Sequence, residues 1–459
     1  MSHMKTITQW LVLAVILIGI GIRLSVYGDL KLSVANRDTG SYILSSEVDL
    51  LSWKAFTTYR PYTTNLIYKI FTPGDGYRNR AVSDGDTGTV KRKVDRGAKD
   101  IVLLQVAVSI IGWACLAWSF SSRLKNGIVK VVSAATIVLF GFTPQAADWD
   151  SVLSPESLSI SLFVLSYAIL IWLAFVYYES PKTTPKNITA FVILFAALFF
   201  WVFTRDVNGY SLLFLMFFIL GLYFFPQYRK TKFLLLASLA VFSLFILGNI
   251  SARQRTLWNL ALTHVWVSDV LSSQNNIQYF TEKGMPEYET PEYYEWFDKY
   301  APSTYMQFLV SHPGYTIYKF FRDQHIAFSE NKQPYFKANE LRFRPSLIMI
   351  GDYMHPTSQT TFVVVLILLL ALWSQFIFQK NRAALPWMWL MTWGFLIATS
   401  TLFFSIFGDS WGLARHALSS TMTYRLLMWL LLILLVDFST SREENNSPHV
   451  EQRITQEKA

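Results

Sequence analysis

Long apolar runs recur along the chain at a length that suits crossing a membrane. A helix needs about 20 apolar residues to cross the hydrocarbon core of a bilayer. Runs of this kind lie at residues 9–28, 100–120, 129–145, 156–178, 188–204, 209–225, 232–250, 360–379, 385–407 and 419–438. The pattern predicts an all-α polytopic membrane protein with about ten transmembrane helices. The first run lacks a small-residue cleavage site and leads into further spans, so we interpret it as an anchor.

The composition agrees with a chain whose main solvent is lipid. Hydrophobic residues make up 52% of the 459 residues, and only 15% are charged, whereas soluble domains carry about a quarter charged residues. The net charge is +9, but Lys and Arg are dispersed between the apolar runs. We therefore predict cations that flank membrane spans, and no nucleic-acid partner. The single cysteine, Cys115, excludes a disulfide framework.

Basic residues mark one set of alternate loops between the predicted spans. They are Arg123, Lys125 and Lys130; Lys182 and Lys186; Arg229, Lys230 and Lys232; and Lys380 and Arg382. With ten spans these loops share one side with both termini, and the positive-inside rule makes that side cytoplasmic. We therefore expect a multi-pass protein of the plasma (inner) membrane with both termini in the cytoplasm. The opposite side receives residues 29–99, 146–155, 204–208, 251–359 and 408–418.

The predicted organisation is a single transmembrane unit over residues 1–438. Its long outer loops, at about 29–99 and 251–359, are rich in Tyr, Trp, Pro and charge, so we expect them to be folded. Residues 292–300 and 315–328 have the pattern of amphipathic helices at the membrane interface. Residues 74–99 have the composition of a mobile loop, and residues 439–459 that of a disordered cytoplasmic tail.

The first cluster of candidate functional residues follows the first span, at residues 36–42. Polar groups next to a membrane span are costly, and a cluster of them suggests a functional site. Asp38 is placed to take a proton from a hydroxyl as a general base. The alternative is structural, because Asp is also a favoured residue at the N-cap of a helix.

The second cluster lies at residues 147–157, where the fourth span begins. Ser154, Pro155 and Glu156 have the pattern of an ordinary helix start, with a cap, a proline at the first position and an acid in the first turn. This explains Glu156 but not Asp148 and Asp150. Three acids within nine residues could bind a cation or hold an acceptor sugar by its hydroxyls.

Two further clusters, at residues 204–209 and 408–416, contain cations suited to phosphate. The guanidinium fork of Arg205 matches phosphate oxygens. Alternatively, Arg205 pairs with Asp206, and the Asn-Gly sequence that follows makes a tight turn. Arg415 and His416 precede the last span on the outer side, where the positive-inside rule does not explain them. They are either a phosphate clamp or side chains that snorkel to the interface.

Several familiar motifs are absent from the sequence. It has no Walker loop, no Rossmann glycine fingerprint, no Cys/His metal pattern and no nucleophile elbow. The histidines His264, His312, His325 and His355 are scattered, so a metal remains undetermined.

The order and sidedness of these clusters resemble the GT-C class of integral membrane glycosyltransferases. The resemblance depends on an acidic motif after the first span, an acid followed by Pro-Glu-Ser at the start of the fourth, an Arg between adjacent spans, and Arg-His before the last. In this chain these are Arg37–Tyr42, Asp150–Ser157, Thr204–Asp206 and Arg415–His416.

The resemblance implies a GT-C-like fold with two amphipathic helices in the first outer loop, here within residues 45–70. It also implies an inverting displacement on the extracytoplasmic side by a hexosyl- or pentosyltransferase of cell-envelope glycans. The donor would be a sugar on a polyprenyl phosphate, and the acceptor a glycan or glycolipid. No cofactor is certain, and a divalent cation stays open.

The resemblance also assigns roles to residues. Asp38 would be the catalytic base. Asp148, Asp150 or Glu156 would position the acceptor or a divalent ion. The donor phosphate would be bound by Arg205, Arg415, His416 and Arg60.

Three other interpretations stay open at this stage. A lipid or glycan transporter predicts charges within the spans and broken helices near the bilayer midplane, whereas the runs here are nearly free of ionisable groups. An O-antigen-type polymerase or ligase needs basic residues in its large outer loop; here these are Arg253, Arg255, Arg322, Arg342 and Arg344. For a scaffold protein the acid clusters would be incidental.

Overall fold

The computed structural model describes residues 2–28, 30–72, 79–83, 90–94, 98–255, 257–337, 341 and 343–446. Within these ranges the regular structure is helical, except for one antiparallel ribbon of β1 (Asn79–Ser83) and β2 (Val90–Val94). The prediction of an all-α membrane protein is therefore confirmed.

Among the described residues, eight helices are long and apolar enough to span a membrane. They are α1 (Ser2–Val26), α5 (Ala98–Arg123), α8 (Pro155–Glu179), α9 (Pro185–Val202), α11 (Lys232–Gln254), α17 (Thr360–Ile377), α18 (Leu385–Gly408) and α20 (Leu418–Asn446). A ninth span results if α6 (Gly127–Phe142) counts together with the helical segment that follows it after a bend of 45°. That segment contains α7 (Pro144–Ala147) and the short 3-10 helix η1 (Asp148–Ser151).

Each of the ten predicted runs coincides with a helix. Two of these helices fail the length criterion for a span, which is why eight spans are found instead of ten. One run is the bent pair that begins with α6. Another is α10 (Asp206–Leu222), which is apolar but only 17 residues long. At 1.5 Å per residue such a helix covers about 25 Å, slightly less than a typical hydrocarbon core.

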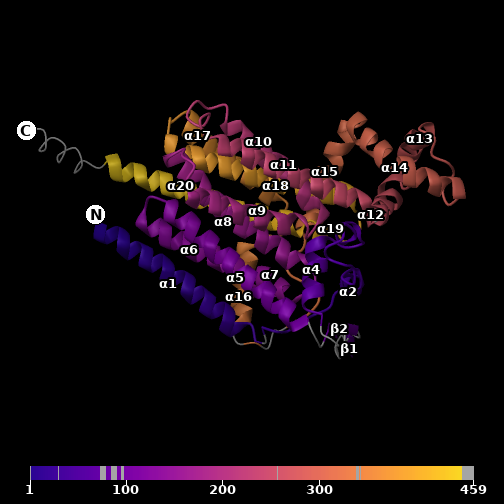
Figure 1. Cartoon of the computed structure of the whole chain (residues 1–459), viewed down its shortest axis with the longest axis horizontal. Helices are drawn as coiled ribbons and strands as arrows, with labels where there is room; N and C mark the ends of the chain where they lie inside the picture. Colours follow the sequence, from indigo (N-terminus) through magenta and orange to yellow (C-terminus); the bar gives the residue numbers. More distant parts are fainter. Residues whose placement is uncertain are drawn as a thin grey trace, which may run out of the picture.

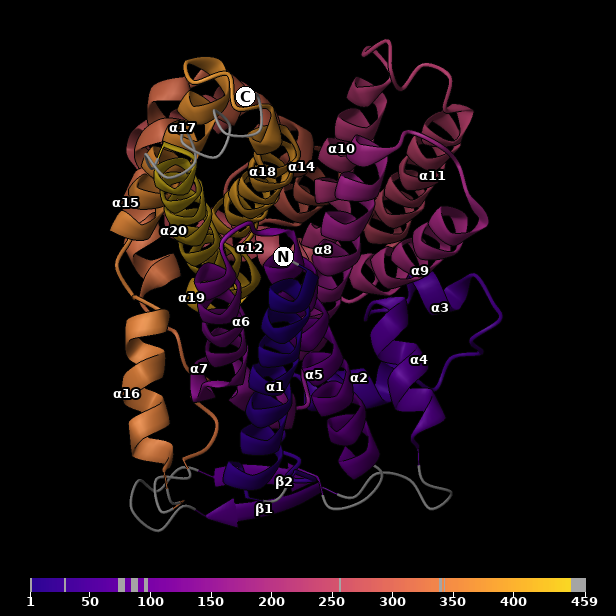
Figure 2. The same ribbon diagram turned by 90° about the vertical axis from the view of Figure 1, so that its left-hand side faces the viewer.

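The helices form a bundle with α8 near its middle (Figure 2). The most hydrophobic 18-residue windows of α8 and α20 are each 72% buried, whereas that of α1 is 22% buried. The first helix therefore lies at the periphery with a broad face towards lipid. The start of α1 and the end of α20 lie at one end of the bundle, and α12 (Leu257–Val265), α14 (Pro291–Ser311) and α19 (Leu413–His416) lie at the other (Figure 1).

The described part of the first long loop, which was predicted to lie outside, contains three short helices, α2 (Thr39–Ser45), α3 (Lys54–Thr57) and α4 (Tyr62–Ile70). Two helices were predicted within residues 45–70, and α3 and α4 occupy this range. Between residues 74 and 99 the strands β1 and β2 pair, and α5 already begins at Ala98. The remainder of that predicted mobile loop lies outside the described residues. The predicted disordered tail begins as helix, since α20 continues to Asn446, and residues 447–459 lie outside the described ranges.

The second outer loop is folded, as predicted, and residues 292–300 and 315–328 are both helical. Its elements are α12 (Leu257–Val265), the π-helix η2 (Trp266–Val270), α13 (Gln274–Glu282), α14 (Pro291–Ser311), α15 (Pro313–Phe328) and α16 (Arg344–Met354). Trp266 is fully buried and packs against the rings of Phe280 and Phe297. Lys319 is also buried, between the carboxylates of Asp269 and Asp323 at 2.7 Å from each.

Several helices begin with the local signals that the sequence carries. The side chain of Asn126 accepts hydrogen bonds from the first turn of α6, and Thr184 and Thr290 do the same for α9 and α14. At α8, Pro155 occupies the first position as predicted, but the hydroxyl of Ser154 makes no cap hydrogen bond. The location of this helix start is therefore right, and the predicted cap interaction is wrong.

A buried ion pair joins the peripheral α1 to the rest of the bundle. Arg23 near the end of α1 is 2.9 Å from the carboxylate of Asp150, and both side chains are 2% exposed. Asp150 also accepts a hydrogen bond from Ser157 at 2.6 Å, and Gln105 donates to its backbone oxygen at 2.7 Å. Through its carboxylate and its backbone oxygen, Asp150 therefore holds α1, α5 and α8 together.

An arginine that the apolar pattern concealed lies inside the last span. Arg425 is fully buried in α20 and donates to the carbonyl oxygens of Phe328, Glu330 and Pro356 at 3.0, 3.2 and 2.9 Å. Because α15 ends at Phe328, the cation also lies at the negative end of that helix dipole. One of the two spans with the most buried windows thus contains a charge that fixes the loop onto the bundle.

The Arg23–Asp150 pair predicts a large structural effect of one substitution. Asp150→Asn leaves a buried arginine without its counter-charge, so we expect it to lower the free energy of unfolding by about 3–5 kcal/mol. The matched control is Glu179→Gln, which removes the more exposed partner of Arg123 and is expected to cost about 1 kcal/mol or less. Chemical unfolding in detergent, followed by tryptophan fluorescence, measures both. Equal losses in the two variants would contradict the structural role of Asp150.

Candidate active site

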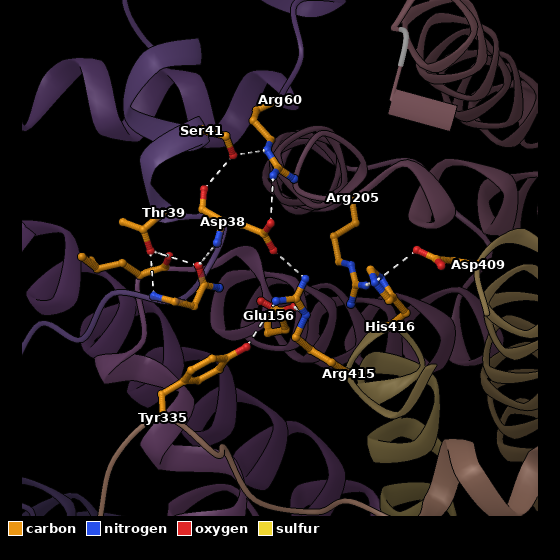
Figure 3. A network of polar contacts seen from close by, with 12 residues as sticks. Asp38, Thr39, Ser41, Arg60, Glu156, Arg205, Tyr335, Asp409, Arg415 and His416 are labelled. Atoms are coloured by element: carbon orange, nitrogen blue, oxygen red, sulfur yellow. Dashed lines mark hydrogen bonds and ion pairs between the residues drawn. The ribbon is translucent and has the colours of Figure 1, made fainter. Parts of the chain in front are cut away.

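A cluster of charged side chains surrounds Asp38 (Figure 3). It lies at the end of the bundle that contains α2 and α19, away from the start of α1 (Figure 1). One oxygen of Asp38 is 2.6 Å from Nη2 of Arg415, and the other is 3.3 Å from Nη2 of Arg60. The Asp38 side chain is 26% exposed, so the carboxylate is accessible although it is paired with two arginines. Asp38 and Arg415 are 377 residues apart in the sequence.

The backbone around Asp38 is anchored to the start of α8. Val34 forms an isolated parallel bridge with Val152, and the hydroxyl of Thr39 donates to the carbonyl oxygen of Leu153 at 3.1 Å. Asp38 occupies the N-cap position of α2, but its side chain makes no cap hydrogen bond. Helix capping therefore does not account for this carboxylate, which points instead towards the two arginines.

Arg60, between α3 and α4, is held from several directions. Its Nε donates to the hydroxyl of Ser41 at 2.8 Å, and its backbone N–H donates to the hydroxyl of Ser45 at 3.0 Å. The guanidinium also lies over the ring of Tyr42, 4.5 Å from the ring centroid. These contacts fix the direction in which the cation faces Asp38.

Arg415 lies in α19 and contacts three separate parts of the chain. Besides Asp38, its Nε lies 3.6 Å from Glu156 in the first turn of α8, and its Nη1 donates to the hydroxyl of Tyr335 at 3.2 Å. Glu156 is buried, and its Oε2 has no hydrogen-bond partner. A buried carboxylate oxygen without a donor is costly in a resting protein and is available to a ligand.

His416 and Arg205 form a second branch of the cluster beside Arg415 (Figure 3). Nδ1 of His416 is 3.4 Å from Nη2 of Arg205, and its Nε2 is 3.4 Å from a carboxylate oxygen of Asp409. The other oxygen of Asp409 is 2.9 Å from Nδ1 of His264, whose ring stacks on Trp411 at 4.4 Å. Because an arginine can only donate, Nδ1 of His416 accepts from Arg205 and Nε2–H donates to Asp409.

The structure also decides between the alternatives for residues 204–209. Asp206 is 2.7 Å from Arg255 rather than paired with Arg205, so the predicted self-satisfying Arg205–Asp206 pair is wrong. The Asn208-Gly209 turn is wrong as well, since both residues lie within α10. The amide of Asn208 instead donates to the backbone oxygen of Trp201 and to two hydroxyls.

The three acids of residues 147–157 are separated into three ion pairs. Arg344 pairs with Asp148, Arg23 with Asp150, and Arg415 with Glu156. Of the three, only Glu156 contacts the Asp38 cluster. Within the described ranges no three His, Cys, Asp or Glu side chains are arranged to hold a metal ion. These acids therefore do not fit a shared cation site, and we assign no step to a metal.

The charges of the cluster change the proton affinities of its members. Burial opposes the ionisation of Asp38, but Arg415 and Arg60 outweigh it and hold the pKa of this carboxyl below its ordinary value. Burial, assisted by the nearby charge of Arg205, lowers the pKa of His416 to about 4 against the opposing effect of Asp409. Near neutral pH the site thus presents an ionised carboxylate and a neutral imidazole.

Sequence comparison finds no family model that matches this chain and no matching curated protein. Among solved structures it is similar to archaeal oligosaccharyltransferase AglB from Archaeoglobus fulgidus in complex with an inhibitory peptide and a dolichol-phosphate, with a TM-score of 0.42 and 11% identity over 95% of this chain and 52% of that one. The apo form of the A. fulgidus oligosaccharyltransferase gives a TM-score of 0.43 at 11% identity, over 95% of this chain and 52% of that one. The form tethered to an acceptor peptide gives 0.44 at 11% identity, over 96% and 51%.

The chain thus spans about half the length of the enzyme it resembles. Similarity at this level says nothing of what the chain acts on.

Sequence reasoning missed several contributors to the cluster. Tyr335 and His264 come from the long outer loop, where nothing in the local pattern distinguishes them. Asp409 lies in the same segment as Arg415 and His416, at residues 408–416. This closeness in sequence was the signal that could have identified Asp409 as part of the cluster. Ser41 lies in the same segment as Asp38, and its role in holding Arg60 needed the folded chain.

The lowered pKa of His416 predicts how stability depends on pH. The ordinary pKa of histidine is 6.5, so His416 of the unfolded chain binds a proton below this pH. In the folded chain it binds the proton only when the pH falls to about 4. Stability from this group is therefore complete above pH 6.5 and is lost as the pH falls towards 4. Arg205, Arg415, Asp409 and Asp38 are the charged groups that face the ring.

We expect the thermal midpoint of the wild type to fall by roughly 2–4 °C more than that of His416→Gln over this pH range. His325→Gln, at an exposed position, is the control and should behave like the wild type. Parallel pH curves for the wild type and His416→Gln would contradict the prediction.

Proposed function

We propose that this chain is a membrane glycosyltransferase of the GT-C type, which transfers a sugar from a polyprenyl-phosphate donor to a hydroxyl of a glycan or glycolipid acceptor. The observation that carries the proposal is the convergence on Asp38 of cations from separate segments at one end of an apolar bundle. Arg60 and Arg415 contact the carboxylate directly, and Arg205 lies alongside through His416.

Arginines suit the phosphate of such a donor. A phosphate that leaves a sugar gains negative charge, and cations already fixed in position stabilise that charge without reorganisation. Arg60 is fixed by Ser41 and Tyr42, and Arg205 by His416. In the resting site Arg60 and Arg415 pair with Asp38. The donor phosphate would replace Asp38 as the partner of these arginines.

Asp38 takes the role of general base in the proposed reaction. The acceptor hydroxyl oxygen attacks the anomeric carbon and its proton passes to Asp38, while the bond from that carbon to the phosphate oxygen breaks. The bonding electrons leave with the polyprenyl phosphate, whose charge the arginines hold. One displacement of this kind inverts the configuration at the anomeric carbon.

The ion pairs of Asp38 couple donor binding to this base. In the resting site Arg415 and Arg60 hold the pKa of Asp38 low, which makes the carboxylate a weak base. When the donor phosphate attracts the same arginines, that stabilisation is reduced and the proton affinity of Asp38 rises. The base thus becomes stronger when the donor is bound.

Glu156 would contact the acceptor. Its Oε2 is buried without a hydrogen-bond partner, while Oε1 is near Arg415. A hydroxyl donated to Oε2 would satisfy this atom and place the acceptor beside Asp38. Asp148 and Asp150 were the alternatives for this role, but each carboxylate is paired with a buried arginine, so we assign acceptor positioning to Glu156 alone.

The position of the site in the membrane follows from charge. The basic loops that flank α5, α8, α10 and α17 lie at the end of the bundle opposite Asp38, and the positive-inside rule makes that end cytoplasmic. The proposed site is then extracytoplasmic, at the edge of the bilayer. A donor with an isoprenoid tail in the lipid can present its phosphate at this depth.

Transport is a weaker interpretation of the same residues. A transport pathway needs charged groups that face a path between the spans. Arg23 and Arg425, which lie within span helices, are occupied by Asp150 and by backbone carbonyl oxygens. The charged groups of the Asp38 cluster lie at one end of the bundle rather than along a path between the spans, which favours chemistry there.

The first test is sugar transfer by purified protein in nanodiscs, with a panel of radiolabelled polyprenyl-phosphate sugars and native glycolipid acceptors. Asp38→Asn removes the base, so we expect kcat to fall about 10²- to 10⁴-fold while donor binding persists. Asp49→Asn, an exposed acid of the same loop, is the control and should keep wild-type activity. Unchanged activity in Asp38→Asn would refute its role as base, and wild-type transport without transfer would refute the proposed function.

The phosphate role predicts that lysine cannot replace the arginines. Arg415→Lys and Arg205→Lys keep the charge but lose the fork geometry, so we expect kcat to fall about 10²-fold or more. Arg253→Lys, at an exposed position of α11, is the matched control. Kinetics with saturating acceptor separate kcat from the KM for the donor. Full activity in both site variants would exclude these arginines from leaving-group stabilisation.

A further inference from the structure

An apolar cavity lies at the end of the bundle remote from Asp38. It holds about 330 Å³ of unfilled space, and its walls come from α8, α9, α10, α11, α17 and α18. The lining residues include Leu170, Tyr178, Phe218, Ala237, Trp373 and Trp389. From Tyr178 to Leu170 along α8 the cavity extends about 12 Å, at 1.5 Å per residue, so it reaches towards the middle of the bilayer.

Several polar groups in the wall are already hydrogen-bonded within the protein, although the buried hydroxyl of Tyr177 has no hydrogen-bond partner. The hydroxyl of Tyr178 donates to the carbonyl oxygen of Arg382 at 2.9 Å, and the indole of Trp389 donates to that of Phe218 at 3.2 Å. The indole of Trp373 donates to the hydroxyl of Thr392 at 3.1 Å. Most of the lining side chains are aliphatic or aromatic, so hydrocarbon is the chemistry that fits the wall.

The mouth of the cavity has the opposite character. Three loops, at residues 180–187, 223–232 and 378–384, meet there, and Thr231 joins two of them through a hydrogen bond to the carbonyl oxygen of Pro181 at 2.8 Å. These loops contain no Asp or Glu. They carry seven exposed cations: Lys182, Lys186, Arg229, Lys230, Lys232, Lys380 and Arg382.

From this combination we infer a binding site for one anionic phospholipid of the adjacent leaflet. Its acyl chains fill the apolar cavity, and its negatively charged headgroup lies against the basic loops. The apolar wall selects hydrocarbon, the depth matches a chain that enters from the membrane surface, and the excess of cations selects negative charge. This inference does not depend on the proposed glycosyltransferase reaction, since the cavity is at the other end of the bundle from Asp38.

Lipid binding by the purified full chain tests the site. Native mass spectrometry in detergent, with phosphatidylglycerol or phosphatidylcholine added, measures the occupancy of one tightly held lipid. We expect phosphatidylglycerol to bind about tenfold tighter, an effect of the size that one or two interfacial cations produce. Ala237→Trp places an indole in the cavity and should abolish this binding. Ala240→Trp, on the same helix but outside the cavity lining, should not.

A second measurement needs no cavity-filling variant. Phosphatidylglycerol with brominated acyl chains quenches nearby tryptophans, so the wild type should lose more fluorescence than the double variant Trp373→Phe with Trp389→Phe. Replacing Arg229, Lys230 and Lys232 by Gln should leave quenching intact but remove the preference for phosphatidylglycerol.

Three results would overturn the inference. These are equal binding of both lipids by the wild type, equal quenching in the wild type and the double variant, and a polyprenyl phosphate co-purifying in place of a phospholipid.

Discussion

The ion pair between Asp38 and Arg415 is the interaction on which the arrangement of the candidate site depends. It joins the first outer loop to the segment before the last span, and Arg415 extends the contact to Glu156 and Tyr335. Without Asp38, Arg415 would keep Glu156 as its one carboxylate partner among the described residues. Four segments distant in sequence meet because one guanidinium has donors on several sides.

The need to pair charged groups also explains how the rest of the bundle is held together. A charge in or beside hydrocarbon must be neutralised or hydrogen-bonded by the protein itself. Arg23 is neutralised by Asp150, Arg344 pairs with Asp148, and Arg425 is surrounded by carbonyl oxygens. These contacts hold the helices together. In the Asp38 cluster, by contrast, the Asp38 carboxylate stays accessible to solvent and one oxygen of Glu156 lacks a donor, which leaves room for a ligand.

The sequence allowed the helices to be predicted well, because an apolar run of sufficient length is a local property. Residue pairing depends on which segments meet in space, and here prediction was mixed. Asp38, Arg60, Glu156, Arg205, Arg415 and His416 do lie together. Asp148 and Asp150 do not join them, since Arg344 and Arg23 bind these acids from segments that no local pattern connects. Arg205 and Asp206 are neighbours in sequence but project towards different partners. Arg425 escaped notice because one arginine scarcely changes the hydropathy of a long apolar helix.

The Arg23–Asp150 pair also constrains the order of events during synthesis. The two residues are separated by 127 positions, so Arg23 leaves the ribosome roughly 6–25 s before its partner at ordinary elongation rates. During this interval α1 has to hold an unpaired guanidinium at the edge of the bilayer, which its position near the end of the helix permits by reaching towards headgroups. Arg425 has no such wait, because its carbonyl partners at residues 328, 330 and 356 are synthesised before it. Assembly of the bundle is therefore completed in two stages, with α1 fastened only after the segment that contains Asp150 has emerged.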